Sequence, residues 1–235
     1  MNSKITIKTI LVDIEGTTSS INFVHEVLFP YAKEKLKSFI IDNFDRSEVK
    51  ELMMDVLETV GVEAKEKDQI IRQSCKYLSE WINEDKKIRV LKELQGLIWE
   101  DGYKDGAFHG HIYEDAYKNL SVWKEQGYEL FVYSSGSVKA QKLLFGHTQY
   151  GDLNNLFSGN FDTTIGAKRD EQSYIRIAKT IKKPCQEILF LSDNNEELIA
   201  AQKAGMEVIK LARPEDKIPA SDMFTSVQDF NEIKI

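Results

Sequence analysis

The chain has 235 residues, of which 42% are hydrophobic and 29% charged, a composition that excludes collagen-like, disulfide-scaffold and wholly disordered proteins. Its 38 acidic residues outnumber its 31 lysines and arginines, and the net charge of −7 argues against binding to a nucleic-acid backbone. The two cysteines, Cys75 and Cys185, are too few for a disulfide framework, and no apolar run approaches the roughly 20 residues of a membrane span. We therefore expect a cytoplasmic monomer without a nucleic-acid or membrane partner.

Four short apolar runs, each bounded by polar or glycine residues, predict buried strands. They lie at residues 8–13, 129–134, 187–192 and 206–211. Between them, apolar residues recur at helical spacing around residues 112–120, 174–181 and 198–204. Strands that alternate with helices predict an α/β fold with a parallel, doubly wound sheet of the Rossmann-like kind.

The stretch from about residue 20 to residue 105 has apolar positions at helical spacing and no strand-like run, which predicts four helices. Asp45 and Glu48 have the spacing of a capping box for the second helix, and Gly61 follows its last apolar residue. We expect residues 1–18 and 107–235 to form the α/β core and residues 19–106 to form a helical cap over the strand ends. An ordinary accessory bundle would have the same periodicity.

Several common signatures are missing from the sequence. It contains no GxGxxG, no GxxxxGK[ST] and no GxSxG, so dinucleotide-binding, P-loop and serine-hydrolase sites lack their motifs. His109 and His111 lie two residues apart, but no third histidine or cysteine ligand is near them in sequence. We expect this pair to be structural or solvated.

Acidic residues follow two of the predicted strands. Asp13 and Glu15 stand in LVDIEGTT, where Gly16 allows a tight turn, and Asp193 stands in LSDNNEEL. Because parallel strands end at the same edge of a sheet, the three carboxyl groups should lie close together. Few carboxylates, completed by water and substrate phosphate, form a site typical of Mg²⁺.

Groups that could bind phosphate are predicted at the same edge of the sheet. The YSSGS segment places Ser134 and Ser135 after the second predicted strand, with backbone N–H groups that precede a helix. Lys168 lies just before another predicted helix and adds a positive charge. Each pattern alone is typical of helix caps and turns. Together they predict a site for phosphoryl transfer.

The series LVDIEGT, VYSSGS, Lys168 and LSDNNEE resembles the four signature motifs of the haloacid-dehalogenase-like (HAD) superfamily of aspartate-nucleophile phosphatases. More narrowly, DIEGTTSSINFVHEVLFPYA, LQGLIWEDGY, VYSSGSVKAQKLLFGH and FDTTIGAKRDEQSY are similar to the enolase-phosphatase, or acireductone synthase, family of methionine salvage. The resemblance covers residues 8–213, and no pattern is recognised after Pro214. Most superfamily phosphatases have an aspartate two residues after the nucleophile. This chain has Glu15 at that position, and the enolase-phosphatases share the glutamate.

This resemblance implies a HAD core with an inserted helical cap, and a role for each motif. Asp13 would be the nucleophile and Glu15 the proton donor and acceptor, with Lys168 as the third catalytic residue. Mg²⁺ would be held by Asp13, the backbone carbonyl of Glu15 and Asp193. Ser134, Ser135 and Lys168 would bind the phosphate of a small phosphomonoester, 2,3-diketo-5-methylthiopentyl-1-phosphate.

Phe23, Trp99 and Tyr103 lie near the two ends of the predicted cap and are candidates for an apolar pocket around the methylthio tail. Packing at the hinge explains them as well. Three other functions stay open: a capped phosphatase for a sugar phosphate or nucleotide, a non-catalytic phosphate-binding or scaffold module, and a phosphotransferase or mutase. The base for enolisation is either Glu15 or Lys168.

Overall fold

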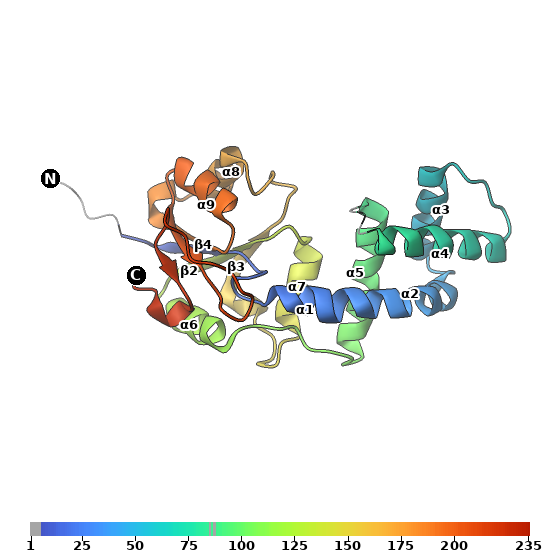
Figure 1. The fold of residues 1–235 in the computed structure, drawn as a ribbon, viewed down its shortest axis with the longest axis horizontal. Helices are drawn as coiled ribbons and strands as arrows, with labels where there is room; N and C mark the ends of the chain where they lie inside the picture. Colours follow the sequence, from blue (N-terminus) through green and yellow to red (C-terminus); the bar gives the residue numbers. More distant parts are fainter. Residues whose placement is uncertain (1–5, 85, 87) are drawn as a thin grey trace. The chain divides into compact units, whose positions relative to one another are not determined.

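The computed structural model describes residues 6–84, 86 and 88–235. The chain divides into two compact units, and its path through them is shown in Figure 1. The first unit contains the N-terminal segment up to Val24 together with His109–Ile235. The second contains His25–Phe108.

The first unit is built on a parallel sheet with the strand order β3-β2-β1-β4-β5-β6. The central strand β1 pairs with β2 on one side and β4 on the other, with Leu11 opposite Phe131 and Phe190. This confirms the predicted α/β class and parallel sheet. The strands are β1 (Thr9–Val12), β2 (Glu129–Tyr133), β3 (Phe157–Phe161), β4 (Ile188–Ser192), β5 (Glu207–Leu211) and β6 (Ser226–Val227).

Helices cover both faces of this sheet. Side chains of successive strand residues point to opposite faces, so a run of apolar residues leaves both faces apolar and both must be buried. On one face Leu11, Phe131 and Phe190 form a buried cluster with residues of α8 and α9, while α6 lies across the sheet from them (Figure 1). The helices are α1 (Ile21–Phe23), α6 (Glu114–Glu125), α7 (Val138–Gly146), α8 (Glu171–Ile181) and α9 (Asn195–Lys203), with short 3-10 turns at Asn154–Leu156, Cys185–Glu187 and Phe230–Glu232.

Side-chain caps start the helices that follow the strand ends. Ser137 accepts a hydrogen bond from the N–H of Ala140 at the start of α7, and Asp170 and Asn194 cap α8 and α9 in the same way. These caps fix the loops in which the predicted phosphate-binding residues lie.

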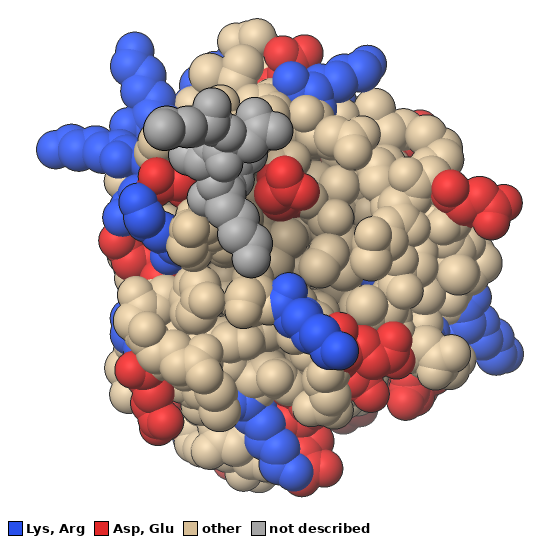
Figure 2. Space-filling view, turned by 90° about the vertical axis from the view of Figure 1, so that its left-hand side faces the viewer, with Lys and Arg blue, Asp and Glu red and all other residues tan. Residues whose placement is uncertain are grey.

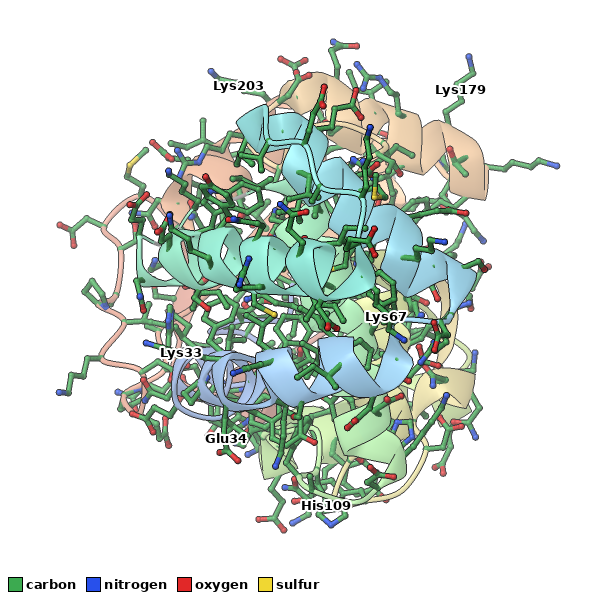
Figure 3. The ribbon with its side chains drawn as sticks, turned by 90° about the vertical axis from the view of Figure 1, so that its right-hand side faces the viewer. Lys33, Glu34, Lys67, His109, Lys179 and Lys203 are labelled. Atoms are coloured by element: carbon green, nitrogen blue, oxygen red, sulfur yellow. The ribbon has the colours of Figure 1, made fainter. Side chains whose placement is uncertain are left out.

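The second unit is a helical bundle. A π-helix at Val24–Leu28 leads into α2 (Phe29–Asn43), followed by α3 (Ser47–Val60), α4 (Lys67–Asn83) and α5 (Arg89–Lys104). Helices α2 and α4 run side by side, with Lys67 at the start of α4 (Figure 3). Buried aliphatic and aromatic side chains from all four helices form its core, as the helical periodicity predicts.

The predicted capping box of α3 is wrong. The helix has Arg46 at its N-cap without a side-chain cap, and the Asp45 carboxylate instead accepts from Lys67 Nζ at 2.9 Å. At the other end the prediction is confirmed, since Gly61 adopts a left-handed conformation with φ of 68°.

The surface carries charges of both signs. On the face drawn in Figure 2, lysines, arginines and acidic residues are interspersed over a largely uncharged background. In the part of the chain that the structure describes, we find no helix with the length and hydropathy needed to cross a membrane. Both cysteines are free thiols.

Candidate active site

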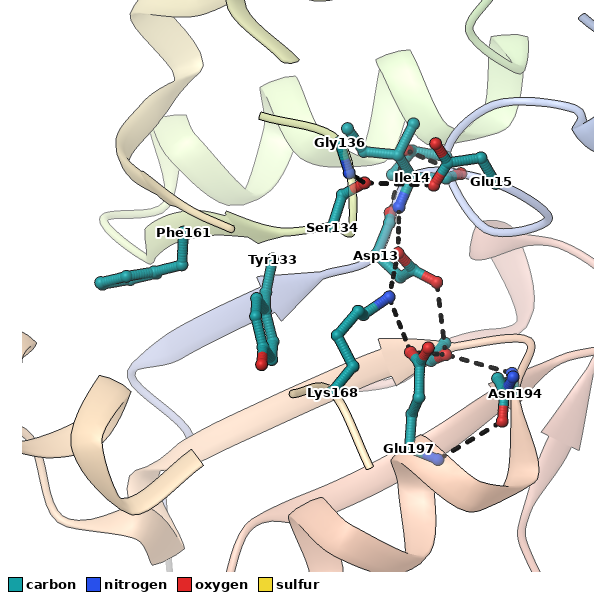
Figure 4. Close-up of polar contacts among 12 residues, drawn as sticks. Asp13, Ile14, Glu15, Tyr133, Ser134, Gly136, Phe161, Lys168, Asn194 and Glu197 are labelled. Atoms are coloured by element: carbon teal, nitrogen blue, oxygen red, sulfur yellow. Dashed lines mark hydrogen bonds and ion pairs between the residues drawn. The ribbon is translucent and has the colours of Figure 1, made fainter. Parts of the chain in front are cut away.

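Asp13 follows β1 directly and lies at the carboxyl end of the sheet, where its N–H donates to Leu191 O of β4 at 3.0 Å. Asp13 is buried, with 3% of the residue exposed. Oδ1 accepts from Lys168 Nζ at 2.5 Å and from the N–H of Ile14 at 2.8 Å, whereas Oδ2 lies 3.5 Å from Ser192 Oγ (Figure 4). One carboxylate oxygen is therefore firmly held, and the other is much less engaged.

Lys168 comes from the loop between β3 and α8 and is 8% exposed. Its Nζ bridges Asp13 Oδ1 and Glu197 Oε2, which lies 2.7 Å away. Burial alone would lower the pKa of Lys168, but the negative charges of Asp13 and Glu197 outweigh it and raise that pKa. Lys168 is thus a permanent cation beside the Asp13 carboxylate.

Glu15 lies two residues beyond Asp13, and its Oε2 accepts from Ser134 Oγ at 3.2 Å (Figure 4). Burial, followed by the negative charge of Asp13, raises the pKa of Glu15 above its ordinary value. A raised pKa favours the protonated form of the carboxyl group and makes its carboxylate a stronger base, and general acid–base catalysis uses both forms.

Asp193 follows β4 at the same edge of the sheet. Burial, followed by the charge of Asp13, raises the pKa of Asp193 to about 7. A Cβ atom on Gly16 would lie 2.7 Å from Asp193 Oδ2, and Gly16 has a φ of 72°, so only glycine fits this turn. The structure therefore brings the predicted Asp193 carboxylate against the turn that carries Asp13 and Glu15.

The carboxyl groups suit a divalent cation. Burial and the charge of Asp13 raise the pKa values of Glu15, Asp193 and Glu197, which means that negative charge at this edge is only partly compensated. Among the described residues, however, no three histidine, cysteine or acidic side chains are grouped as metal ligands. Two carboxylates and one backbone carbonyl, with water in the remaining positions, are the donor set expected for Mg²⁺, so the residues fit this ion.

Ser134 and Ser135 differ in their surroundings. Ser134 is fully buried; its Oγ donates to Glu15 and accepts the N–H of Gly136 at 3.1 Å. Ser135, in contrast, is exposed at the tip of the turn.

The three aromatic candidates belong to different units. Phe23 is buried in the first unit, 6.3 Å from the ring of His111. Trp99 and Tyr103 lie on α5 in the second unit, where Tyr103 is buried and Trp99 is half-buried. The indole N–H of Trp99 donates to Leu28 O at 2.8 Å and so ties α5 to the π-helix.

Sequence reasoning missed Glu197 as a site residue. It lies four residues after Asp193, in the first turn of α9, and accepts from Lys168 Nζ and from Ser192 Oγ at 3.0 Å. The spacing of Asp193 and Glu197 was visible in the sequence, but a second acid in the first turn of a helix is also common without any site.

The chain matches the haloacid dehalogenase-like hydrolase family over residues 7–205. It therefore belongs to the haloacid dehalogenase-like hydrolases. It is 52% identical over 230 residues to enolase-phosphatase E1 of Sulfurihydrogenibium sp., covering 97% of this chain and 98% of that protein. It is also 49% identical over 229 residues to enolase-phosphatase E1 of Aquifex aeolicus, covering 97% of this chain and all of that protein. Within the hydrolases, the chain belongs to the enolase-phosphatases.

Two solved structures have a similar fold. The UTR4 protein of Saccharomyces cerevisiae is 33% identical, with a TM-score of 0.81 over 97% of this chain and 100% of its own. The L-2-haloacid dehalogenase PA0810 is 16% identical, with a TM-score of 0.57 over 96% of this chain and 97% of its own, and shares the fold alone.

Proposed function

We propose that the chain is a Mg²⁺-dependent phosphatase in which Asp13 is the nucleophile and which converts 2,3-diketo-5-methylthiopentyl-1-phosphate to the acireductone. The observation that carries this proposal is the buried contact of Asp13 with Lys168, beside a Glu15 whose pKa is raised. The chain's membership of the enolase-phosphatases supports the choice of substrate.

Asp13, the backbone carbonyl of Glu15 and Asp193 would hold Mg²⁺. When bound, the ion would offset the repulsion between the Asp13 carboxylate and the substrate phosphate, which is on the order of 4 kcal/mol per pair of unit charges at 4 Å. Lys168 supplies a second, fixed positive charge from the protein itself.

Attack by Asp13 on phosphorus forms an O–P bond and breaks the bond from phosphorus to the substrate oxygen on C1, which leaves an aspartyl-phosphate. Glu15 gives its proton to the departing oxygen. The Glu15 carboxylate then takes a proton from water as that water attacks phosphorus, which frees Asp13 and inorganic phosphate. Ser134 orients Glu15 through its hydroxyl, and Lys168 holds the phosphate charge.

Enolisation requires a base that removes a proton from C1. The raised pKa of Lys168 keeps its amine protonated, whereas the raised pKa of Glu15 makes its carboxylate a stronger base. Of the two candidates left open by the sequence, these shifts favour Glu15.

The remaining parts of the proposal concern recognition. Trp99, Phe23 and Tyr103 stay proposed as contacts for the methylthio tail, and Ser135 as a phosphate contact through the turn it shares with Ser134. We also propose a cytoplasmic monomer that takes a small phosphomonoester and has no nucleic-acid or membrane partner; gel filtration and light scattering test the monomer.

Phosphate release from a panel of phosphomonoesters, with and without Mg²⁺, tests the function. We expect turnover of the diketone phosphate to exceed that of sugar phosphates and nucleotides, and to stop when Mg²⁺ is removed. Preferred turnover of a sugar phosphate or nucleotide, or full activity with excess chelator, would contradict the proposal.

A further inference from the structure

The segment that follows β5 contacts the turn that carries Asp13 and Glu15. The contacts lie at residues that come after Glu15 in the chain. This segment, Arg213 to Asp216, belongs to no motif of the proposed reaction. Arg213 is nonetheless only 2% exposed, and Asp216 is half-buried. Both side chains bind residues that lie two to six positions beyond Glu15.

The turn from Asp13 to Ser19 is a compact body held by its own backbone. The carbonyl of Ile14 accepts the N–H groups of Thr17, Thr18 and Ser19 at 3.1, 3.0 and 2.9 Å. The N–H of Gly16 donates to Ser19 O at 2.8 Å, and Thr18 Oγ1 donates to Asp13 O at 3.0 Å. A displacement at one end of such a turn therefore moves the other end, where Asp13 and Glu15 lie.

Arg213 binds the middle of this turn. Its Nε and Nη2 donate to Thr17 O at 3.2 and 2.9 Å, and Nη1 donates to Asp115 Oδ1 at 2.9 Å. The guanidinium also lies 4.1 Å from the ring centroid of Tyr113. A buried guanidinium is tolerated only when its charge and N–H groups are satisfied, so these contacts fix its position and, with it, the Thr17 carbonyl.

Asp216 binds the end of the turn, where the chain continues toward the second unit. It accepts from Ser20 Oγ at 2.5 Å, from the N–H of Ile21 at 3.2 Å and from the hydroxyl of Tyr113 at 2.8 Å. His111 adds a further contact, since its Nδ1 accepts the N–H of Ser20 at 3.0 Å. Burial lowers the pKa of His111, which keeps the ring neutral and able to accept this bond.

We propose that Asp216, together with Arg213, is a positioning residue that holds the Asp13–Ser19 turn so that Glu15 stays in place for proton transfer. The proposal rests on the function assigned to Glu15 above. Neither side chain touches the reacting atoms. Arg213 acts through the Thr17 carbonyl, and Asp216 acts through the Ser20 hydroxyl and the Ile21 N–H. A shift of about 1 Å in a catalytic group can lower turnover by roughly 100-fold, so loss of this contact should be visible in kcat.

A double-mutant cycle tests the proposal, because it measures whether Asp216 acts through Glu15. Asp216→Ala is made in the wild-type and Glu15→Gln backgrounds, with kcat, KM and the melting temperature measured for each. We expect kcat to fall roughly 10–100-fold in the wild-type background, with little change in KM, and less than about threefold in the Glu15→Gln background. Glu215→Gln, at an exposed neighbouring position, is the matched control and should behave as wild type in both.

The proposal would be overturned if Asp216→Ala lowered kcat by the same factor in both backgrounds, or if it lowered the melting temperature and left kcat unchanged. Tyr113→Phe removes a single hydrogen bond to Asp216 and provides a second variant in case Asp216→Ala does not fold. It should lower kcat less than Asp216→Ala does, and again more in the wild-type than in the Glu15→Gln background.

Hydrogen exchange gives a readout that does not depend on activity. In the Tyr113→Phe and Asp216→Ala proteins, the amides of Thr17, Thr18 and Ile21 should exchange faster than in wild type and in Glu215→Gln. Unchanged exchange would overturn the anchoring itself. If the wild-type chain released no phosphate while these amides responded as expected, the assigned function would be wrong and the anchoring would stand.

Discussion

At the scale of single residues, the site is governed by its balance of charge. Buried Lys168 bridges Asp13 and Glu197. Burial together with the charge of Asp13 raises the pKa values of Glu15, Asp193 and Glu197. The arrangement proposed to make Glu15 a proton donor would also make this edge of the sheet favourable for a divalent cation. Proton transfer and metal binding can therefore be tested separately by substitutions that keep the shape of each side chain.

Glu15→Gln keeps the shape of the side chain and the backbone carbonyl but cannot transfer a proton. We expect kcat to fall by roughly 10²–10⁴, the usual contribution of general acid–base catalysis, while the Mg²⁺ concentration for half-maximal activity changes little. Steady-state kinetics over a Mg²⁺ series measures both quantities. An unchanged kcat, or a collapse of Mg²⁺ affinity, would contradict the role of Glu15.

Asp13→Asn separates the two reactions of the proposed site. The amide cannot attack phosphorus, so we expect neither aspartyl-phosphate nor free phosphate, whereas removal of the C1 proton does not need that attack. In D₂O and high Mg²⁺, the variant should incorporate deuterium at C1 or accumulate the enol phosphate. Mass spectrometry measures both, and their absence with metal shown to be bound would mean that Asp13 takes part in enolisation.

At the scale of the elements, the stability of helix α3 depends on the left-handed residue at its C-terminus, Gly61. Gly61 has a φ of 68° and its N–H donates to Glu58 O at 3.1 Å, while a Cβ placed there would meet no atom within 4 Å. The effect of Gly61→Ala is thus one of backbone conformation alone. We expect a loss of about 1 kcal/mol in unfolding free energy, measured by urea denaturation, with unchanged kcat.

Gly96→Ala is the contrasting control for Gly61. Gly96 lies inside α5, has no atom within 4 Å of a built Cβ and does not have a positive φ. Alanine favours a helix interior, so this substitution should leave stability equal or higher. A similar loss for both variants would show that the left-handed conformation at Gly61 is not the cause.

The sequence predicts a strand where the apolar pattern of the segment agrees with its burial in the fold. Strands β1, β2 and β4 contain buried apolar runs, because both faces of a parallel sheet are covered. Strand β5 has the shorter apolar pair Val208 and Ile209, followed by Lys210 and Leu211. Strand β3 was missed because Ser158, Gly159 and Asn160 interrupt its apolar residues. Tertiary packing favours glycine at position 159, since a Cβ there would make a tight contact of 3.2 Å with the ring of Phe131 on β2.

The same reasoning explains which site residues were found. Asp13 and Ser134 end predicted strands and Asp193 directly follows one, so the topology alone brings them to one edge. Contacts of Asp216 join segments that lie 103 to 196 positions apart in sequence, and no local pattern encodes them.

At the scale of the whole molecule, the site couples stability to pH. The pKa of Asp193 is raised to about 7 in the folded protein, whereas an aspartate in an unfolded chain has a pKa of about 3.9. The folded state therefore binds this proton more tightly, so its contribution to stability is greatest at low pH and is lost as the pH rises toward 7. The raised pKa values of Glu15 and Glu197 act in the same direction.

Mg²⁺ should reverse this dependence, because it competes with protons for ionised carboxylates and binds the folded state. Without Mg²⁺, we expect the melting temperature to fall between pH 5 and pH 8; the increase caused by Mg²⁺ should be small at pH 5 and large at pH 8. In Asp193→Asn the fall should be shallower and the Mg²⁺ effect weaker, since one titrating ligand is gone. Asp222→Asn, at an exposed position, should match wild type in a calorimetric series over these pH values. If Asp193→Asn gave the wild-type pH dependence and the wild-type response to Mg²⁺, Asp193 would be neither the titrating group nor a metal ligand.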